Sequence, residues 1–366
     1  MGLSIGLVGL PNVGKSTTFN ALTKAQNAEA ANYPFCTIEP NKATVPVPDI
    51  RLNELAKIVN PERIQHSTLD FVDIAGLVKG ASKGEGLGNK FLSNIRETEV
   101  ILQIVRCFED DNIVHTEGRI DPLSDVEIIE NELIFADIEV LTNRIERLKK
   151  QAKNEKDAAA MMAFAEELAE FLAEGNLARN FPKADSEMYE KLINEVRLLS
   201  AKEIMYGANV DEDGLSEDNE YVQRLREHAA KHGCEVIKLC AKIEEELVGM
   251  EDDERDEFLR DMGVEESGLE QIIRKGFDKL GLMSYFTAGV KEVRAWTIHK
   301  NTTAPKAAAV IHNDFEKGFI RAEVIGYEDF IACGGEAKSK EAGKMRLEGK
   351  EYIVQDGDIM HFRFNV

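Results

Sequence analysis

The sequence predicts an α/β fold, in which a mostly parallel β-sheet carries helices on both faces. Three observations support this class. An apolar segment at residues 3–8 runs through a glycine-rich turn into a helix-compatible stretch, and two more apolar segments, at 68–74 and 202–210, end in polar residues. The carboxyl ends of parallel strands meet at one edge of a sheet, where ligand groups are placed. The polar residues at these three strand ends are therefore candidate site residues.

The turn after the first strand has the spacing of a phosphate-binding loop, Gly-x4-Gly-Lys-Ser, from Gly9 to Ser16. A triphosphate needs several convergent N–H donors, which a main chain bent through glycines presents without side-chain clash. The helix that follows adds a partial positive charge at its N-terminus. We expect Lys15 to reach the β and γ phosphates and Ser16 to hold Mg²⁺ through its hydroxyl.

Two further segments are expected to sense the γ-phosphate. Thr37 lies in a polar, turn-rich stretch 21 residues beyond Ser16, so its hydroxyl can reach Mg²⁺; the alternative is an ordinary turn residue. Asp73 stands at the end of the second strand, where it can hold the Mg²⁺ shell through water. The N–H of Gly76 can contact the γ-phosphate, and the high glycine content after it disfavours fixed structure.

Hydrolysis requires a group that orients the attacking water. Ras-type GTPases use a glutamine after the glycine, but this chain has Leu77, which cannot do so. His115 is one candidate, because an imidazole titrates near neutrality; the alternative is a surface histidine without a role. Asn12 is another candidate and could hold a monovalent cation such as K⁺ against the phosphates, unless it only supports the shape of the loop.

The third strand leads into the sequence N-V-D-E at 209–212, where GTPases present Asn-Lys-x-Asp. Val210 replaces the lysine, and Glu212 is one methylene longer than aspartate, so the bidentate contact to guanine is not set up. The Asn209 amide matches the acceptor N1 and the donor N6 of adenine. We therefore expect ATP to be preferred, with GTP as the alternative.

One more strand is expected at 235–239. It ends in Cys240 and Ala241, whose main chain would then face the edge of the base. These two residues complete the expected base site.

From 122 to about 200 the pattern changes to long helix. Apolar residues recur at spacings of three and four, first from Ile134 to Leu148 and again from Met161 to Leu172. Two such stripes joined by a short polar turn predict an antiparallel helical hairpin. Its apolar stripe forms its own core, and its charged outer faces contact solvent or a partner. The remainder, from about 283, is expected to be a compact α+β module.

The formal net charge of −22 argues against a protein that coats nucleic acid or a membrane surface. The charge is uneven: residues 284–366 hold 12 basic and 12 acidic side chains, which leaves 33 basic and 55 acidic on residues 1–283. If any part contacts RNA, the neutral C-terminal segment meets the least repulsion. Elsewhere the acidic charge is expected to be solvated helix surface.

The 5 cysteines are scattered and include no CxxC pair, which indicates neither a disulfide framework nor a zinc site. No signal-peptide pattern precedes the first strand, and no apolar run approaches the ~20 residues of a membrane span. We therefore expect a reduced, cytoplasmic protein without membrane contact.

Taken with these residues, the chain resembles the Obg-like ATPase family, in its YchF branch of translation-factor-related P-loop proteins. The resemblance covers essentially the full length. The motifs that carry it are GLPNVGKS at 9–16, YPFCTIEPN at 33–41, DIAGLVKGAS at 73–82, NVDE at 209–212, YFTAGVKEVRAWTI at 285–298 and DFEKGFIRAEVI at 314–325.

The resemblance implies a G-domain-like ATPase with a coiled-coil insertion and a C-terminal TGS module of the ubiquitin-like β-grasp kind. It implies ATP preferred over GTP, Mg²⁺ dependence, and association with the ribosome, with the large subunit as the expected contact and RNA contacts through the TGS module or the helical insertion. The expected domains are a nucleotide-binding domain at 1–122 and, with the linker, 201–282, the insertion at 123–200 and the TGS module at 283–366. Nucleotide and metal contacts carry over onto Asn12, Val13, Gly14, Lys15, Ser16, Thr17, Thr37, Asn209 and Val210.

The expected function is a slow ATP-hydrolysing molecular switch, in which ATP and Mg²⁺ order residues 30–40 and 76–90 and hydrolysis releases them. Two alternatives stay open. A phosphotransferase needs an acceptor pocket and a basic lid, whereas the insertion is helical and the segment after it acidic. A nucleotide-sensing adaptor with negligible hydrolysis is compatible with Leu77.

Overall fold

The computed structural model describes residues 3–29, 41–74, 87–114, 118–153 and 155–365. Contacts divide the chain into two compact units. None of the helices in the described ranges combines the length and the apolar character that a bilayer span requires. The first unit comprises Met1–Ala28, Thr37–Ala43 and Asp70–Ile272, and the second comprises Glu29–Cys36, Thr44–Leu69 and Ile273–Val366.

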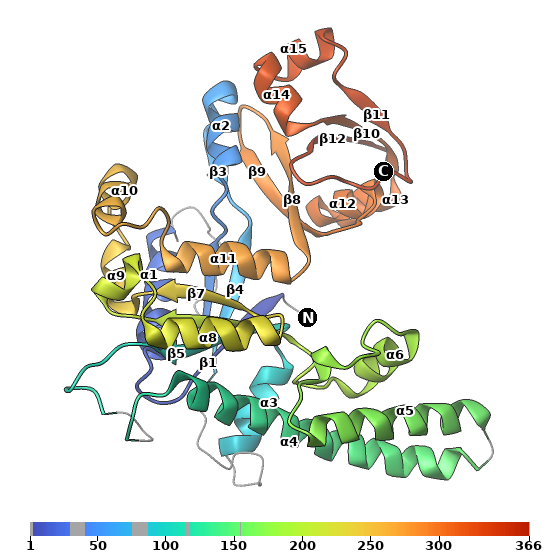
Figure 1. Ribbon diagram of the computed structural model, residues 1–366. Helices are drawn as coiled ribbons and strands as arrows, with labels where there is room; N and C mark the ends of the chain where they lie inside the picture. The colour runs from blue at the N-terminus through green and yellow to red at the C-terminus, as the bar shows by residue number, and fades with distance from the viewer. Residues whose placement is uncertain (1–2, 30–40, 75–86, 115–117, 154, 366) are drawn as a thin grey trace. The chain divides into compact units, whose positions relative to one another are not determined.

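The first unit is built on a six-stranded sheet with the order β2-β4-β1-β5-β6-β7 (Figure 1). Neighbouring strands from β4 to β7 pair in parallel. β1 and β5 are buried along their whole length, as expected of strands covered on both faces. The predicted α/β class is confirmed. The strands are β1 Ser4–Val8, β2 Lys42–Pro46, β4 Thr68–Asp73, β5 Val100–Arg106, β6 Glu203–Asn209 and β7 Glu235–Leu239.

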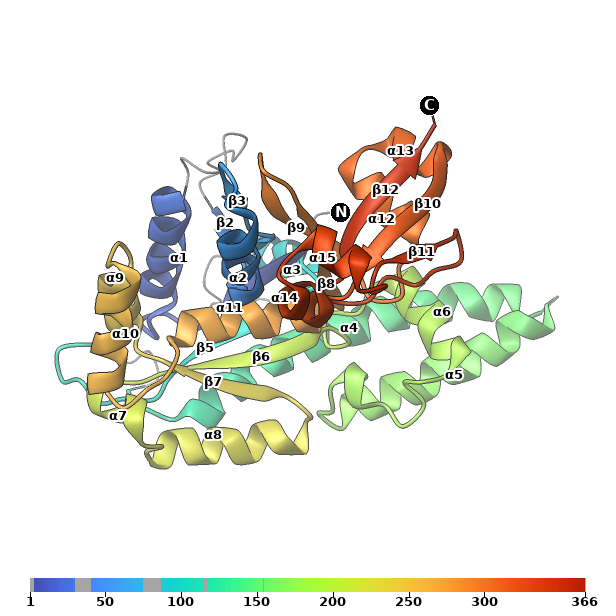
Figure 2. The same cartoon turned by 90° about the horizontal axis from the view of Figure 1, so that it is seen from above.

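Helices lie on both faces of this sheet. α8 and α11 are on opposite sides of β7 (Figures 1 and 2), and α4 packs against β5 and α8. α11 begins in the first unit and ends in the second. The helices are α1 Lys15–Glu29, α3 Leu87–Arg96, α4 Pro122–Gln151, α5 Lys156–Ala173, η2 Ala178–Asn180, α6 Glu187–Val196, α7 Glu212–Ser216, α8 Glu220–Lys231, α9 Ala241–Leu247, α10 Asp252–Asp261 and α11 Gly268–Lys279.

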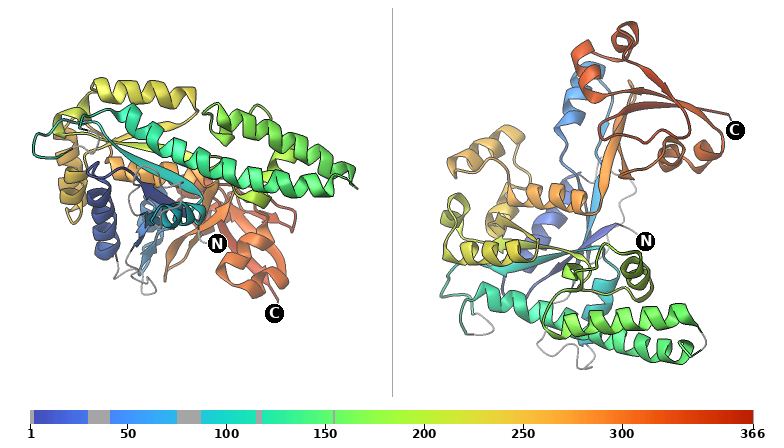
Figure 3. Two further views of the ribbon diagram at one scale, coloured as in Figure 1. Left: turned by 90° about the horizontal axis from the view of Figure 1, so that it is seen from below. Right: turned by 45° about the vertical axis from the view of Figure 1, so that its right-hand side comes forward.

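α4 and α5 lie side by side and run in opposite directions (Figure 3). A buried carboxylate joins α4 to the chain segment that precedes β6. Asp137 on α4 accepts hydrogen bonds from the N–H groups of Leu199 and Ser200, both at 2.7 Å, and from the Ser200 hydroxyl at 2.6 Å. Its side chain thereby joins the long helix to the chain that returns to β6. Because Asp137 is only 1% exposed, water cannot replace these bonds.

The second unit contains another six-stranded sheet, with the order β11-β10-β12-β8-β9-β3. α12 covers one face, where Tyr285, Val324 and Phe362 are buried. α2 and α14 cover the other face, over Phe286 and Ile325. The elements are α2 Ile50–Val59, β3 Ile64–Gln65, β8 Leu282–Ala288, β9 Val293–His299, α12 Ala304–Ile311, α13 Asn313–Lys317, β10 Phe319–Ile325, α14 Tyr327–Cys333, α15 Glu336–Glu341, β11 Arg346–Glu348 and β12 Ile359–Phe364.

Residues 44–69 belong to the second unit, which differs from the expected division that placed all of 1–122 in the nucleotide-binding domain. The reason is the apolar face of α2. Leu52 and Leu55 are fully buried in the cluster that contains Phe286, and Arg51 forms an ion pair with Asp356 at 2.7 Å. β3 extends the sheet by pairing with β9. Local sequence shows the amphipathic helix but not the surface against which it packs.

We predict that Asp137→Asn lowers the free energy of unfolding by about 2 kcal/mol, because the amide turns one acceptor into a donor that faces a buried N–H. Urea denaturation followed by circular dichroism measures the change. Glu139→Gln, on an exposed position of the same helix, is the matched control and should lie within about 0.5 kcal/mol of the parent. Equal effects of the two substitutions would contradict the anchoring role.

Candidate functional site

The turn between β1 and α1 has the geometry of a phosphate-binding loop. Gly14 has φ +97° and Asn12 has φ +64°, so two positions lie in the left-handed region. Thr18 donates from its N–H and its hydroxyl to the Gly14 carbonyl, at 2.9 and 3.0 Å. α1 begins at Lys15, and the Ser16 side chain is exposed at its first turn. The first N–H groups of a helix are thus available to an anion.

Lys15 and Asp73 are brought together at this loop. The Lys15 ammonium donates to the Asp73 carboxylate, and their side chains are 10% and 23% exposed. Asp73 is held in place by its own N–H, which donates to the carbonyl of Asn41 at 2.8 Å. Strand β4 therefore brings its terminal carboxylate to the phosphate loop, as the order of the parallel strands requires.

Asn209, at the end of β6, connects the phosphate loop to the loop after β7. Its amide nitrogen donates to the carbonyl of Val13 at 2.9 Å, and its amide oxygen accepts from the N–H of Ala241 at 3.0 Å. A Cβ on Gly14 would lie 2.1 Å from this amide nitrogen, so only glycine fits there. This geometry differs from the expected pairing of the amide with both N1 and N6 of adenine, because the oxygen and one N–H already have protein partners.

The remaining base-site candidates differ in exposure. Val210 and Cys240 are buried, at 2% and 5%, and burial raises the pKa of the Cys240 thiol. Asp211 caps α7 by accepting from the N–H of Gly214 at 2.9 Å. Glu212 keeps an exposed side chain, 3.5 Å from the Lys242 ammonium. Glu212 is thus the motif's exposed carboxylate, paired with Lys242, while the buried members support the loop.

Arg106, at the end of β5, is a site residue that sequence reasoning missed. It is only 1% exposed, and its guanidinium donates to three main-chain carbonyls of the following loop: Phe108 at 3.1 Å, Asp110 at 3.1 Å and Ile113 at 2.9 Å. Among the described residues, no carboxylate forms an ion pair with it. The signal in the sequence was a lone arginine closing an otherwise uncharged strand, VILQIVR.

The loop that Arg106 organises also contacts the phosphate loop. The Asn12 amide donates to the carbonyl of Val114 at 3.1 Å. This bond uses the nitrogen of Asn12 and leaves its oxygen for a cation. Three other candidates, Thr37, Gly76 and His115, lie outside the described residues.

A second buried carboxylate lies just beyond the base loop. Glu244 on α9 is 4% exposed and accepts from the N–H of Gly268, the first residue of α11, at 2.8 Å. Burial raises the pKa of Glu244 to about 7, although hydrogen bonds from the α11 N-terminus and Ser267 oppose that rise. Gly268 must be glycine, because a Cβ there would lie 2.3 Å from the Lys238 carbonyl.

Comparison with known proteins gives consistent matches. A family model described as "50S ribosome-binding GTPase" matches residues 4–144, and one for the C-terminal part of YchF GTPases, described as "Protein of unknown function (DUF933)", matches 282–365. The chain is 59% identical to "Ribosome-binding ATPase YchF" of Haemophilus influenzae and 53% identical to that of Bacillus subtilis, over 100% of each chain. The solved YchF GTPase of Schizosaccharomyces pombe superposes with a TM-score of 0.90 at 38% identity, covering 99% of this chain and 98% of that one.

The raised pKa of Glu244 makes stability depend on pH. Its folded pKa, about 7, lies above the ordinary 4.5, so the folded chain binds the proton more tightly. The stabilisation is fully present below pH 4.5 and is lost as the pH rises through 7. Glu244→Gln keeps an acceptor for Gly268 but cannot ionise.

We predict that the difference in unfolding free energy between parent and Glu244→Gln falls as the pH rises from 5 to 8 in parallel urea titrations. Exposed Glu246→Gln, on the same helix, should show a difference that is flat across this range. A difference that grows with pH would mean that the native carboxylate is held ionised.

Proposed function

The chain belongs to the YchF family, and we propose that it is a ribosome-binding ATPase that works as a molecular switch. The observation that carries this proposal is the arrangement at the phosphate loop, where Lys15 pairs with Asp73 and the Asn209 amide holds the loop at Val13 beside Gly14. Full-length relatives are named ribosome-binding ATPases. The protein binds and hydrolyses ATP, prefers ATP to GTP, and associates with the ribosome.

In this function the residues of the loop from Asn12 to Thr17 bind the phosphates through their N–H groups. Lys15 exchanges its partner: its ammonium moves from the Asp73 carboxylate to the β and γ phosphates, which carry more charge. That exchange frees Asp73 to accept hydrogen bonds from metal-bound water. The ion pair therefore serves as a stand-in for nucleotide charge, since a buried lysine without a partner would be costly.

The donor set at this loop fits Mg²⁺. The Ser16 hydroxyl is exposed at the start of α1 and offers an oxygen ligand of the kind that Mg²⁺ prefers, and the partly exposed Asp73 carboxylate would hold the metal through water. Thr37 is the proposed second direct ligand. Bound there, Mg²⁺ would supply positive charge that offsets the charge of the phosphates.

The base site is proposed to select adenine through main chain and shape. Asn209 fixes the loop that carries Cys240 and Ala241, and its remaining N–H can meet the base. Val210 offers no ammonium, and Glu212 is one methylene longer than the aspartate that reads guanine, so its carboxylate does not match the bidentate geometry. Guanine therefore gains no extra hydrogen bonds over adenine at this site.

Water attack is proposed to depend on the loop after β5. His115 is the proposed group that orients water in place of the missing glutamine, and Asn12 is the proposed ligand for K⁺. Arg106 holds residues 108–113 through their carbonyls, and Asn12 joins Val114 to the phosphate loop. Arg106 is thus a positioning residue.

The proposed output of the switch is the second unit. We infer that residues 283–366 form a TGS module of the β-grasp kind, and that α4 and α5 form the coiled-coil insertion. Residues 44–69, which pack in the second unit, join the segments that carry Thr37 and Gly76. We propose that a change in either segment is passed along the chain to that unit. The proposed contact is the large ribosomal subunit, reached by a cytoplasmic protein.

Nucleotide competition tests the proposal. We predict that ATP displaces a fluorescent ATP analogue at least tenfold better than GTP, because one mismatched hydrogen bond costs about 1.4 kcal/mol. The double substitution Val210→Lys with Glu212→Asp restores the guanine motif and should shift the ratio toward GTP. Equal or tighter binding of GTP by the parent would favour the GTPase alternative.

Arg106 gives a second test. We predict that Arg106→Gln lowers kcat for ATP hydrolysis at least tenfold and changes the Kd for ATP less than threefold, because the loop shifts while the phosphate loop stays intact. Arg106→Lys should be intermediate, since an ammonium reaches fewer carbonyls. Exposed Arg119→Gln is the matched control.

A double substitution tests the positioning role of Arg106 further. In an Asn12→Ala background, Arg106→Gln should have a smaller effect on kcat, because both changes loosen the same loop. Additive losses, or a loss confined to thermal stability, would contradict the role.

A further inference from the structure

The sheet of the second unit opens between two of its central strands. β8 and β12 are neighbours, yet they pair at a single position, Phe286 opposite Ile359. β8 stays paired with β9 up to Ala288, and β12 stays paired with β10 up to Phe364. The sheet therefore forks beyond this position. The opening between residues 287–288 of β8 and 360–364 of β12 is called here the β8–β12 slot.

The β8–β12 slot is a real cavity. It has a volume of about 520 Å³, which lies in the range of roughly 300–1,000 Å³ found for ligand sites. Beyond Ile359, β12 has a partner strand only on its β10 side. Its other side is thus a strand edge inside the sheet, where main-chain groups can bond an added strand.

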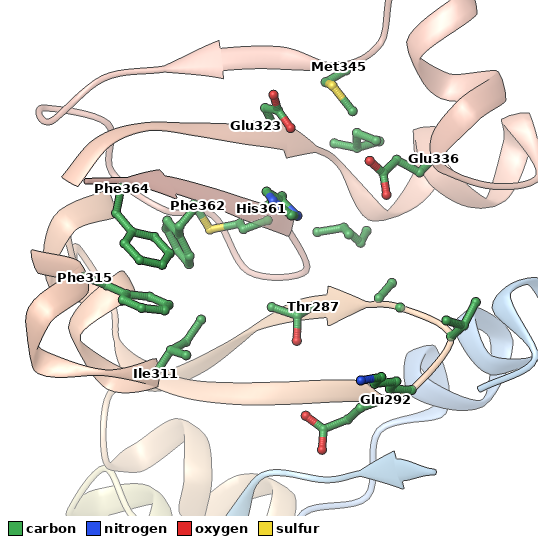
Figure 4. A pocket seen from close by; sticks show the side chains of 17 residues that line it. Thr287, Glu292, Ile311, Phe315, Glu323, Glu336, Met345, His361, Phe362 and Phe364 are labelled. Atoms are coloured by element: carbon green, nitrogen blue, oxygen red, sulfur yellow. The ribbon is translucent and has the colours of Figure 1, made fainter. Parts of the chain in front are cut away.

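The two faces of the slot differ in polarity. On one face Met360 and Phe362 pack with the residues under α12, and Phe315 stacks on Phe364 with ring centroids 3.8 Å apart. Phe364 is 40% exposed. Figure 4 shows Phe315, Phe362 and Phe364 gathered together around the opening. This face offers an apolar surface to one row of side chains.

The opposite face carries charged side chains beside the apolar Met345 and Ile359. His361 lies opposite Glu323 in the register of β12 and β10, so both point to this face, and Glu336 and Met345 line it as well (Figure 4). Glu323 is paired with Arg363 at 3.1 Å. Among the described residues, Glu336 has no ion-pair partner. This face therefore offers a carboxylate to a basic side chain.

We propose that the β8–β12 slot binds an extended segment of a ribosomal protein in which apolar and basic side chains alternate. Successive side chains of a strand point to opposite faces, so this pattern matches the apolar and the carboxylate faces in turn. RNA is disfavoured, because the Glu336 carboxylate would repel phosphates, while the other two glutamates of the lining are paired with Arg63 and Arg363. The choice of a ribosomal partner rests on the proposed function.

The test uses the full chain and an array of overlapping 12-residue peptides from the ribosomal proteins of the source organism, with a 12-nucleotide poly(U) RNA as a separate arm. Binding is then measured by fluorescence anisotropy. We expect the peptides that bind to alternate apolar and basic residues. Glu336→Lys should raise their Kd at least tenfold, whereas Glu341→Lys, exposed on the same helix but outside the slot, should leave it unchanged.

A second pair of variants tests an exposed apolar residue of the slot lining. Val290→Asp changes this residue and should weaken binding, while Val310→Asp, on α12 and outside the slot, should not. Both side chains are exposed, at 71% and 46%, so the fold tolerates the change. The inference is overturned if no peptide binds, if slot and control variants behave alike, or if the RNA binds and loses affinity with the slot variants. Co-sedimentation of the protein with ribosomes tests the proposed function separately, because the peptide assay contains no ribosomes.

Discussion

The buried amide of Asn209 is the interaction on which the candidate site depends. It bonds the phosphate loop at Val13 with one side of its amide and the loop after β7 at Ala241 with the other. A buried amide that lost either partner would pay a desolvation cost of about 1–3 kcal/mol, so the two loops are held in one relative position. Gly14 completes the arrangement, because any side chain there would displace the amide.

Other buried polar groups act in the same way, each binding main chain rather than another charge. Arg106 donates to three carbonyls of the loop after β5, Asp137 accepts from the chain that returns to β6, and Glu244 accepts at the N-terminus of α11. Main-chain groups in loops have no ladder or helix to satisfy them, so a buried side chain that bonds them fixes the loop conformation. The loops around the site are therefore held in place by buried polar side chains that bond their main chain.

Chain order gives the two units a direct connection. Residues 44–69 pack in the second unit, and the strands at their two ends, β2 and β4, extend into the first unit and belong to the sheet that carries the phosphate loop. The flanking segments are those expected to sense the γ-phosphate. α11 provides another covalent connection, from the residue capped by Glu244 to the strand β8.

The sequence by itself determined the α/β class, the phosphate loop and the position of Asp73 at the same edge of the sheet, because these follow from local spacing and from the rule that parallel strand ends share an edge. The ion pair between Lys15 and Asp73 was visible only in the structure. Tertiary structure decided the role of Arg106, the internal bonds of Asn209 and the placement of α2. Each of these depends on a partner more than 100 residues away or on main-chain carbonyls, which every residue type carries. Such partners leave no pattern in the local sequence. The fork between β8 and β12 was equally hidden, since the sequence of each strand is the same whether its neighbour stays paired or diverges.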